Sequence, residues 1–312
     1  MALKKKSQQG GRSSKQALGF SMVAAASLLF GFNGNLSRVL FDQRGVTPIT
    51  LVEFRMLIGG LCLLVVMLIG WRQGLKWYAR SWGWIIAFGL TLAMVTYTYF
   101  MAISLLPIAV ALIIQFSAAA WMALGEAIWK RKLPSLPVII ALICTLCGLL
   151  LLTGVWNLSL NGLNLVGLLF GVLALLFFIA YLLLGKRIGR DVPSLPATAY
   201  GAIVAGIFWL FVQPPWSIPA STWDWQTLLL ITVVGVAGMA IPFALELGAL
   251  RHVDATRVGI VTTLELVAGS IIAYFWLGQQ LDIAQIIGCV LVLAALIVLQ
   301  YDQAPEVPSL TS

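Results

Sequence analysis

The sequence has 312 residues, of which 61% are hydrophobic and only 10% charged, and its formal net charge is +8. Soluble domains are about half apolar and a quarter charged, so this composition excludes an ordinary water-soluble fold. The basic residues form short clusters between apolar runs instead of one stripe on a folded surface, which argues against a nucleic-acid-binding protein. We therefore expect an all-α, multi-pass protein of the cell membrane, surrounded by lipid.

Ten apolar segments follow one another along the chain, and each is long enough to cross a bilayer as a helix of about 20 residues. Polar or Pro-containing loops separate most of them. A basic segment, 1–16, precedes the first span, and a polar segment, 302–312, is expected to form a disordered tail. The expected spans are 17–40, 47–70, 83–103, 105–128, 136–156, 163–185, 195–212, 226–248, 254–277 and 283–301.

The positions of the basic residues predict the orientation of the spans. All but three of the 19 Lys and Arg residues fall in the N-terminal segment or in every second loop, and the exceptions are Arg38, Arg44 and Arg55. Cytoplasmic loops of membrane proteins are enriched in Lys and Arg. Alternating spans therefore place both termini in the cytoplasm, and omitting one span would destroy the pattern.

The chain also shows a weak internal repeat at a shift of about 147 residues. Ser27-Leu-Leu-Phe30 falls on Ala174-Leu-Leu-Phe177, and Gly59 falls on Gly206. The repeat divides the chain into two five-helix halves, 17–157 and 158–301. Because five spans is an odd number, the halves must be inverted relative to each other, as in many secondary transporters.

The segment from Ala244 to Val267 contains Leu-Glu246-Leu-Gly-Ala-Leu-Arg251-His-Val-Asp and later Thr-Leu-Glu265-Leu-Val, and Leu277-Gly278-Gln279 follows. This pattern resembles EamA-type transporters of the drug/metabolite transporter superfamily, in particular the threonine/homoserine-exporter branch. The family often has Pro at the position of Leu266 and Glu at that of Gln279. The resemblance implies a ten-helix fold and the export of amino acids or other metabolites.

Ionisable and polar residues inside the spans are the candidate functional residues, since burying them in lipid costs free energy. Glu265 lies about ten residues into the ninth span, near the bilayer midplane. It is a candidate for substrate or proton binding, and the alternative is an interhelical hydrogen bond. Gln115 and Ser117 lie at a similar depth in the fourth span, as cavity residues or as polar contacts between helices.

Two further carboxylates have a less central position. Glu53 lies in the outer part of the second span, and Arg38 either pairs with it or extends to the membrane interface. Glu246 lies near the cytoplasmic end of the eighth span, where we favour an ion pair with Arg251 or Arg257 over a contact with substrate.

Amide and aromatic side chains complete the set of candidates. Asn33 and Asn35 are expected to interrupt the first span and to present amide groups to a cavity. Tyr97, Tyr99 and Trp121 are candidates for the same wall, although aromatic residues in spans are more often packing groups or interface anchors.

Enzymatic motifs are missing from the sequence. Cys144 and Cys147 form a CxxC inside an apolar run and are best interpreted as packing residues, and His252 is the only histidine. We find no catalytic set, metal-ligand cluster, cofactor motif or nucleotide-binding loop. The sequence therefore predicts a secondary transporter, not an enzyme, that moves a small molecule by alternating access with a proton as the candidate coupling ion. An uncoupled facilitator or exchanger, an intramembrane lipid-modifying enzyme and a passive channel or scaffold are the alternatives.

Overall fold

The computed structural model describes residues 2–76, 78–106, 108–154, 164–278 and 280–301. Within these ranges every regular element is helical and no strand occurs. The helices are α1 (Ala2–Arg44), α2 (Pro48–Gly70), α3 (Trp82–Leu105), α4 (Ile108–Phe116), α5 (Ala118–Lys130), α6 (Leu136–Thr153), α7 (Leu165–Ile188), α8 (Ser194–Val212), α9 (Trp225–Gly235), a π-helical turn η6 (Val236–Ala240), α10 (Ile241–Ala249), α11 (Ala255–Thr262), α12 (Leu264–Leu277) and α13 (Ile283–Tyr301).

The part of the chain that the structure describes contains nine segments long and apolar enough to cross a membrane, and a shorter apolar helix, Ile283–Leu299. Large apolar side chains such as Ile69, Phe211 and Phe275 are more than four-fifths exposed, as expected where a helix faces lipid. The prediction of a multi-pass, all-α membrane protein is thus confirmed. The expected tail, 302–312, lies outside the described residues.

Three of the expected spans are interrupted within the membrane. A single residue, Ser117, separates α4 from α5, and Thr263 separates α11 from α12. The eighth span changes from α9 to α10 through η6, and Pro242 follows at the start of α10. Proline has no N–H to donate to the carbonyl four residues earlier, so the regular helix cannot continue unchanged there.

The expected interruption of the first span at Asn33 and Asn35 was wrong, because α1 continues through both residues. The side-chain amide of Asn35 donates to the carbonyl of Gly31 at 2.9 Å, one turn earlier on the same helix, and to that of Gly269 at 3.1 Å on α12. These bonds support the helix and join it to its neighbour.

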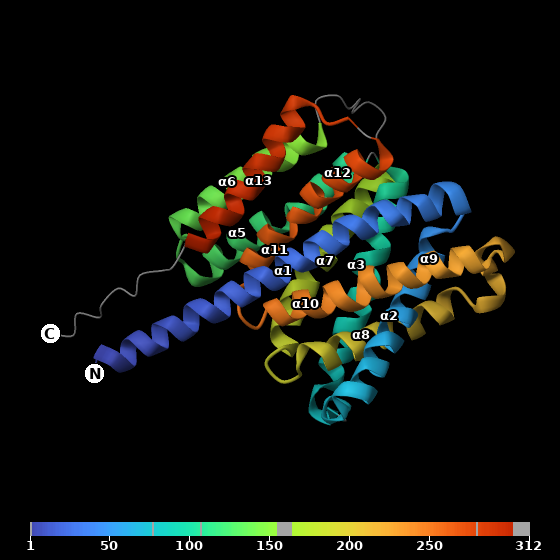
Figure 1. Ribbon diagram of the computed structural model, residues 1–312, viewed down its shortest axis with the longest axis horizontal. Helices are drawn as coiled ribbons and strands as arrows, with labels where there is room; N and C mark the ends of the chain where they lie inside the picture. Colours follow the sequence, from blue (N-terminus) through green and yellow to red (C-terminus); the bar gives the residue numbers. More distant parts are fainter. Residues whose placement is uncertain (1, 77, 107, 155–163, 279, 302–312) are drawn as a thin grey trace.

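Helices from the two halves alternate in the bundle (Figure 1). The long helix α1 crosses the molecule beside α10 and α12, α6 packs on α13, α2 packs on α8, and α3 packs on α7. Replacing each helix by its counterpart in the other half gives the same set of neighbouring pairs. The contact of α1 with α9 and α10 corresponds to that of α7 with α3, and the contact of α1 with α11 and α12 corresponds to that of α7 with α4 and α5.

Close helix contacts depend on small residues. A Cβ added at Gly31 of α1 would lie 2.7 Å from the carbonyl oxygen of Glu265 and from the amide nitrogen of Gly269 on α12. Only glycine permits this approach of two backbones, as small residues do in many membrane proteins. The contact brings α1 and α12 together at the depth where both carry polar side chains.

Candidate functional site

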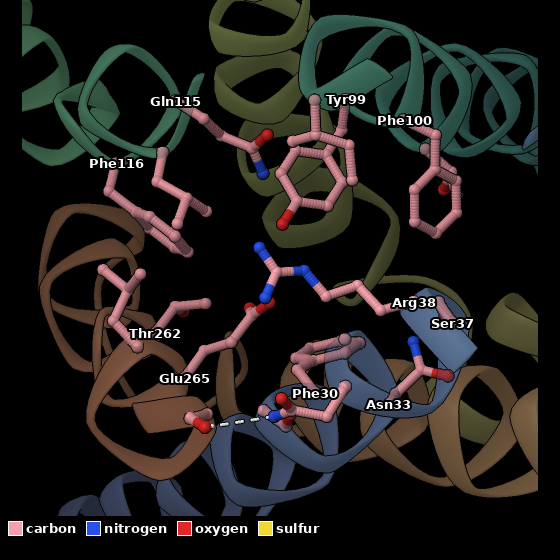
Figure 2. Close-up of a pocket in the computed structure, with 18 of the residues that line it drawn as sticks. Phe30, Asn33, Ser37, Arg38, Tyr99, Phe100, Gln115, Phe116, Thr262 and Glu265 are labelled. Carbon is pink, nitrogen blue, oxygen red and sulfur yellow. Dashed lines mark hydrogen bonds between the residues drawn. The ribbon is translucent and has the colours of Figure 1, made fainter. Parts of the chain in front are cut away.

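A cavity of about 300 Å³ lies at the centre of the bundle, between the two halves (Figure 2). Residues from α1, α2, α3, α4, α6, α7, α10, α11 and α12 line it. These helices belong to eight of the ten expected spans, all except the seventh and the tenth. The volume is at the lower end of the roughly 300–1,000 Å³ typical of small-molecule sites.

Two arginines and two glutamates line this cavity, namely Arg38, Arg55, Glu246 and Glu265. Figure 2 shows the Arg38 side chain extending from α1 into the cavity, with Tyr99 and Glu265 on opposite sides of it. No described residue forms an ion pair with any of these four charged side chains at an N···O distance within 4 Å. A solute with groups of both signs would find opposite charges in the wall.

The environment of Arg55 is unusual for a permanent charge, because its side chain is 4% exposed. Its Nη2 donates to the carbonyl oxygen of Gly238 at 2.6 Å, while Nε has no hydrogen-bond partner among the described residues. The rings of Phe100 and Phe243 lie 5.6 and 5.9 Å from the guanidinium carbon. These contacts hold the guanidinium in place without neutralising its charge.

Glu246 lies at the inner part of the same cavity and not among the loop arginines. Its carboxylate accepts hydrogen bonds from the Tyr181 hydroxyl at 3.0 Å and from the Thr262 hydroxyl at 3.1 Å. The expected ion pair with Arg251 or Arg257 is therefore corrected. The side chain points to the interior of the bundle, where hydroxyl groups of α7 and α11 satisfy it.

Glu265 on α12 faces the cavity with its carboxylate free of any hydrogen bond or ion pair to the described residues. Gln115 on α4 lies across the cavity from it (Figure 2). The Gln115 Oε1 atom is buried and has no partner in the described structure, and the same holds for Asn33 Oδ1 and Ser37 Oγ on α1. These atoms can bond to water or to a bound solute.

Four of the candidates do not line the cavity. Trp121 is 56% exposed on the outside of α5, and Tyr97 packs against Trp209, with ring centroids 4.8 Å apart. The Ser117 hydroxyl donates to the backbone carbonyl of Ile114 at 2.6 Å. Glu53 is 2% exposed on α2 but faces away from the cavity, because the rotation of a helix decides which of its residues share a face.

Sequence reasoning missed several residues of the wall. Arg55 was noted only as one of three exceptions to the pattern of basic residues, although an arginine inside an apolar span was a usable signal. Nothing in the sequence distinguished Ser37, Tyr181 or Thr262 from other hydroxyl residues of the spans. Among the described residues no group of three or more His, Cys, Asp or Glu side chains is arranged to hold a metal ion.

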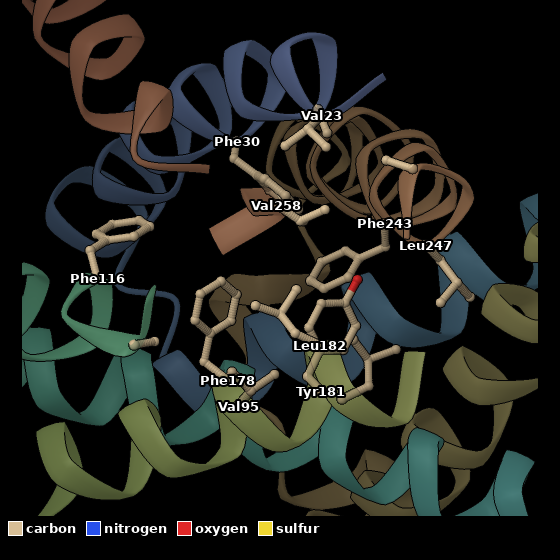
Figure 3. Packing of buried hydrophobic residues seen from close by; sticks show 14 of the residues in the cluster. Val23, Phe30, Val95, Phe116, Phe178, Tyr181, Leu182, Phe243, Leu247 and Val258 are labelled. Atoms are coloured by element: carbon tan, nitrogen blue, oxygen red, sulfur yellow. The ribbon is translucent and has the colours of Figure 1, made fainter. Parts of the chain in front are cut away.

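Buried apolar side chains pack together between the cavity and the helix ends that lead to the basic loops, and Figure 3 shows Val23, Leu182, Leu247 and Val258 among them. Leu182 and Leu247 follow the lining residues Tyr181 and Glu246 directly, and Val258 lies one turn before Thr262. All three are fully buried, as is Val23, two turns before the lining residue Phe30. In the opposite direction the lining residues extend to Arg38 and Phe41 on α1 and to Leu152 and Thr153 at the end of α6.

Polar contacts lie beyond this apolar layer, at the ends of α5, α7 and α11. Lys186 pairs with Asp254, and the Thr256 hydroxyl donates to Glu126, which itself pairs with Lys130 as an i,i+4 neighbour. Burial opposes ionisation of Asp254, but the bond from Lys186 and the nearby positive charges outweigh it and lower the pKa of this carboxyl. The Glu126–Thr256 contact joins the two halves.

A bundle of membrane-crossing helices from two similar halves, arranged around a charged cavity, defines the class of membrane transporters for small metabolites. Comparison with protein families agrees. The EamA-like transporter family matches residues 17–154 and again 165–301, so the chain belongs to this family.

Individual relatives support the same classification. The threonine/homoserine exporter RhtA of Salmonella typhimurium is 24% identical over 282 residues, covering 88% of each chain, and RhtA of Escherichia coli K12 is 23% identical over the same length. The uncharacterized transporter YcbK of Bacillus subtilis is 27% identical over 168 residues, about half of each chain. A crystal structure with 18% identity aligns over 92% of this chain and 96% of its own, with a TM-score of 0.75, and shows the likeness of fold alone.

Proposed function

We propose that this protein is a secondary transporter that exports amino acids or related small metabolites by alternating access. The observation that carries the proposal is the central cavity, which both halves build and in which four charged side chains have no ion-pair partner within the described structure. In lipid, ionisable residues are kept where they face a partner or a pathway.

The closure of the cavity supports alternating access. An apolar layer and then polar contacts block the end with the basic loops, whereas lining residues extend to the last residues of α6 at the other end. If the basic loops are cytoplasmic, as the charge distribution predicts, this arrangement corresponds to an outward-facing state. Rearrangement of the two halves about the cavity would then produce the inward-facing state.

Two features support an inverted repeat. The pairs of neighbouring helices are preserved when the halves are exchanged, and the breaks at Ser117 and Thr263 fall at corresponding places. With five crossings in each half, such an exchange requires opposite orientations of the halves.

The substrate class follows from the relatives and from the cavity together. RhtA, whose sequence is similar over 88% of the chain, is a threonine/homoserine exporter. A cavity of about 300 Å³ with both Arg and Glu in its wall has the size and charge for an amino acid. Glu265, which faces the cavity without a partner, is the proposed proton-binding group.

The test is solute counterflow with the purified full-length chain in liposomes. Liposomes loaded with an unlabelled amino acid are diluted into a trace of the same labelled amino acid, for a panel that includes L-threonine and L-homoserine. A transporter accumulates label transiently above equilibrium, and empty liposomes give the background. Absence of counterflow for the whole panel would contradict the proposal.

The same liposomes separate the alternatives. Net transport that responds to an imposed pH gradient indicates proton coupling, whereas counterflow without such a response indicates a facilitator or exchanger. An intramembrane lipid-modifying enzyme would instead change the phospholipids of the liposome, which mass spectrometry of the lipid extract detects.

A further inference from the structure

The best-defined unsatisfied group in the cavity is the guanidinium of Arg55. It is 4% exposed, and in the described structure only one of its hydrogen bonds is made, from Nη2 to the carbonyl of Gly238. A guanidinium has five N–H donors and stays ionised at every physiological pH. Burying such a charge is costly unless an anion or several acceptors offset it.

The position of Arg55 is determined by an irregular turn of the eighth span. Gly238 lies in the π-helical turn, and Pro242, four residues later, has no N–H to bond to its carbonyl. Arg55 takes up this acceptor at 2.6 Å. Single π-helical turns occur frequently at functional sites, and here the turn provides the fixed anchor for one edge of the guanidinium.

The remaining donors of Arg55 lie between aromatic rings and polar atoms of the cavity wall. Phe100 and Phe243 lie over the guanidinium carbon at 5.6 and 5.9 Å, which attracts the cation but leaves its in-plane N–H groups free. Asn33 packs against Gly238, since a Cβ added there would lie 2.0 Å from Asn33 Oδ1. The Oδ1 atom itself has no partner among the described residues.

We propose that Arg55 binds the carboxylate of the transported solute and that Glu265, once it has released its proton, binds the ammonium group, so that the cavity selects zwitterions over simple amines and over dianions. This inference rests on the proposed function and specifies the chemistry of the same cavity. A planar guanidinium with free donors matches a carboxylate better than the amide and hydroxyl groups of the wall do. The two glutamates of the cavity oppose a doubly charged anion such as a phosphate monoester.

Arg38 does not take the same role, although it also lines the cavity. Its side chain is partly exposed and belongs to the part of α1 near the open end, where water can hydrate the charge. Arg55 on α2 is enclosed by Phe100 of α3, by Gly238 of η6 and by Phe243 of α10, and only 4% of it is exposed. Arg38→Gln is therefore the matched control for Arg55→Gln, with the same change of charge in the same cavity.

The experiment uses the full chain in liposomes and any amino acid that gives counterflow with the wild type. L-Threonine is the first probe, and 1-amino-2-propanol, which lacks only the carboxylate, is its matched competitor. Unlabelled L-threonine should inhibit the wild-type uptake of labelled L-threonine. The amine should need at least about a 10-fold higher concentration for the same inhibition, since it lacks the charge-assisted bond to Arg55. Equal inhibition by the two compounds overturns the inference without any variant.

The variants give a second, independent readout. Arg55→Gln should raise the apparent KM for the amino acid roughly 10- to 100-fold and remove the preference over the amine, while Arg38→Gln keeps that preference. Arg55→Lys keeps the charge but not the planar pair of donors, so its apparent KM should lie between those of the wild type and Arg55→Gln. If Arg55→Gln still prefers the amino acid over the amine, the inference is contradicted, even when counterflow persists. If the wild type exchanges no amino acid, the proposed function itself is contradicted.

Discussion

The hydroxyl groups of Ser117 and Thr263 make the same bond at corresponding places in the two halves of the chain. Each donates to the carbonyl oxygen three residues earlier, at 2.6 Å, and the backbone angles are φ −64° and ψ −11° for Ser117 and φ −62° and ψ −14° for Thr263. Hydroxyl groups that bond back to the helix in this way bend it. The two broken helices, α4–α5 and α11–α12, carry Gln115 and Glu265 on the walls of the cavity.

We predict that Ser117→Ala and Thr263→Val each lower the maximal rate of counterflow and leave the apparent KM unchanged. Loss of one hydroxyl bond of about 1 kcal/mol favours a straighter helix, and both halves need the bend in order to rearrange. The control is Thr232→Val on the exposed face of α9, whose hydroxyl makes a similar bond to Leu228 at 2.7 Å. Wild-type rates in both single variants would contradict a role for the breaks.

Glu265→Gln should abolish the dependence of transport on pH, or reduce transport severely, while the melting temperature stays near that of the wild type. Gln keeps the shape of the side chain but cannot bind and release a proton. The measurement is transport rate against external pH beside a thermal melt of the same preparation. A wild-type profile in this variant would assign Glu265 a structural role only.

Gln115→Ala should raise the apparent KM about two- to tenfold with little change in maximal rate. Gln115 Oε1 is buried without a partner in the described structure, so the substitution removes one hydrogen bond to a bound solute, of about 0.5–1.5 kcal/mol. The control is Tyr97→Phe, which alters a polar aromatic residue of the neighbouring span outside the cavity. An equal loss of affinity in both variants would point to a general disturbance of packing.

The orientation of the chain can be tested by cysteine labelling in a background without the four native cysteines. Ser217→Cys, in the exposed segment between α8 and α9, should react with an impermeant thiol reagent on intact cells. Ser135→Cys, between α5 and α6, should react only after the membrane is permeabilised. The opposite labelling pattern would show that the topology is inverted. The open end of the cavity would then face the cytoplasm.

Asp254→Asn should weaken the closure at the basic end of the molecule. The Lys186–Asp254 pair is partly exposed, with 35% and 61% of the two side chains accessible, so it is worth about 1 kcal/mol at most. External labelling of Thr153→Cys, at the outer end of the cavity, should become two- to fivefold slower because the inward-facing state gains population. Asp191→Asn, which breaks the Arg187 pair within one helix end, should leave the labelling rate unchanged.

The pH dependence of that closure follows from the lowered pKa of Asp254. A carboxyl whose pKa is lowered in the closed state stabilises this state above its ordinary pKa near 4, and the effect is lost as the pH falls through the lowered value. Labelling of Thr153→Cys should thus be insensitive to this group between pH 6 and pH 8. A transition in that range that Asp254→Asn removes would contradict the assignment.

The residues predicted from the sequence differ in outcome for physical reasons. Glu265, Gln115 and Tyr99 lie in the cavity wall, because depth in a span can be counted from its ends. Trp121, a candidate for the same wall, lies on the outside of α5, since counting gives depth but not the rotation of the helix. Glu246 was assigned to loop arginines that are near in sequence, whereas its partners, Tyr181 and Thr262, come from helices that meet it only in the fold.

The sequence by itself determined the class of protein, a multi-pass, all-α membrane transporter, and it predicts the orientation of the spans. It could do so because lipid requires about 20 apolar residues for each crossing and because basic residues gather in loops. Only the tertiary structure decided which polar groups meet. Arg55, Gly238 and Glu265 lie on three spans that are distant in sequence, and their meeting depends on helix rotation, on the turn before Pro242 and on the close contact of Gly31 with Gly269, which no local pattern encodes.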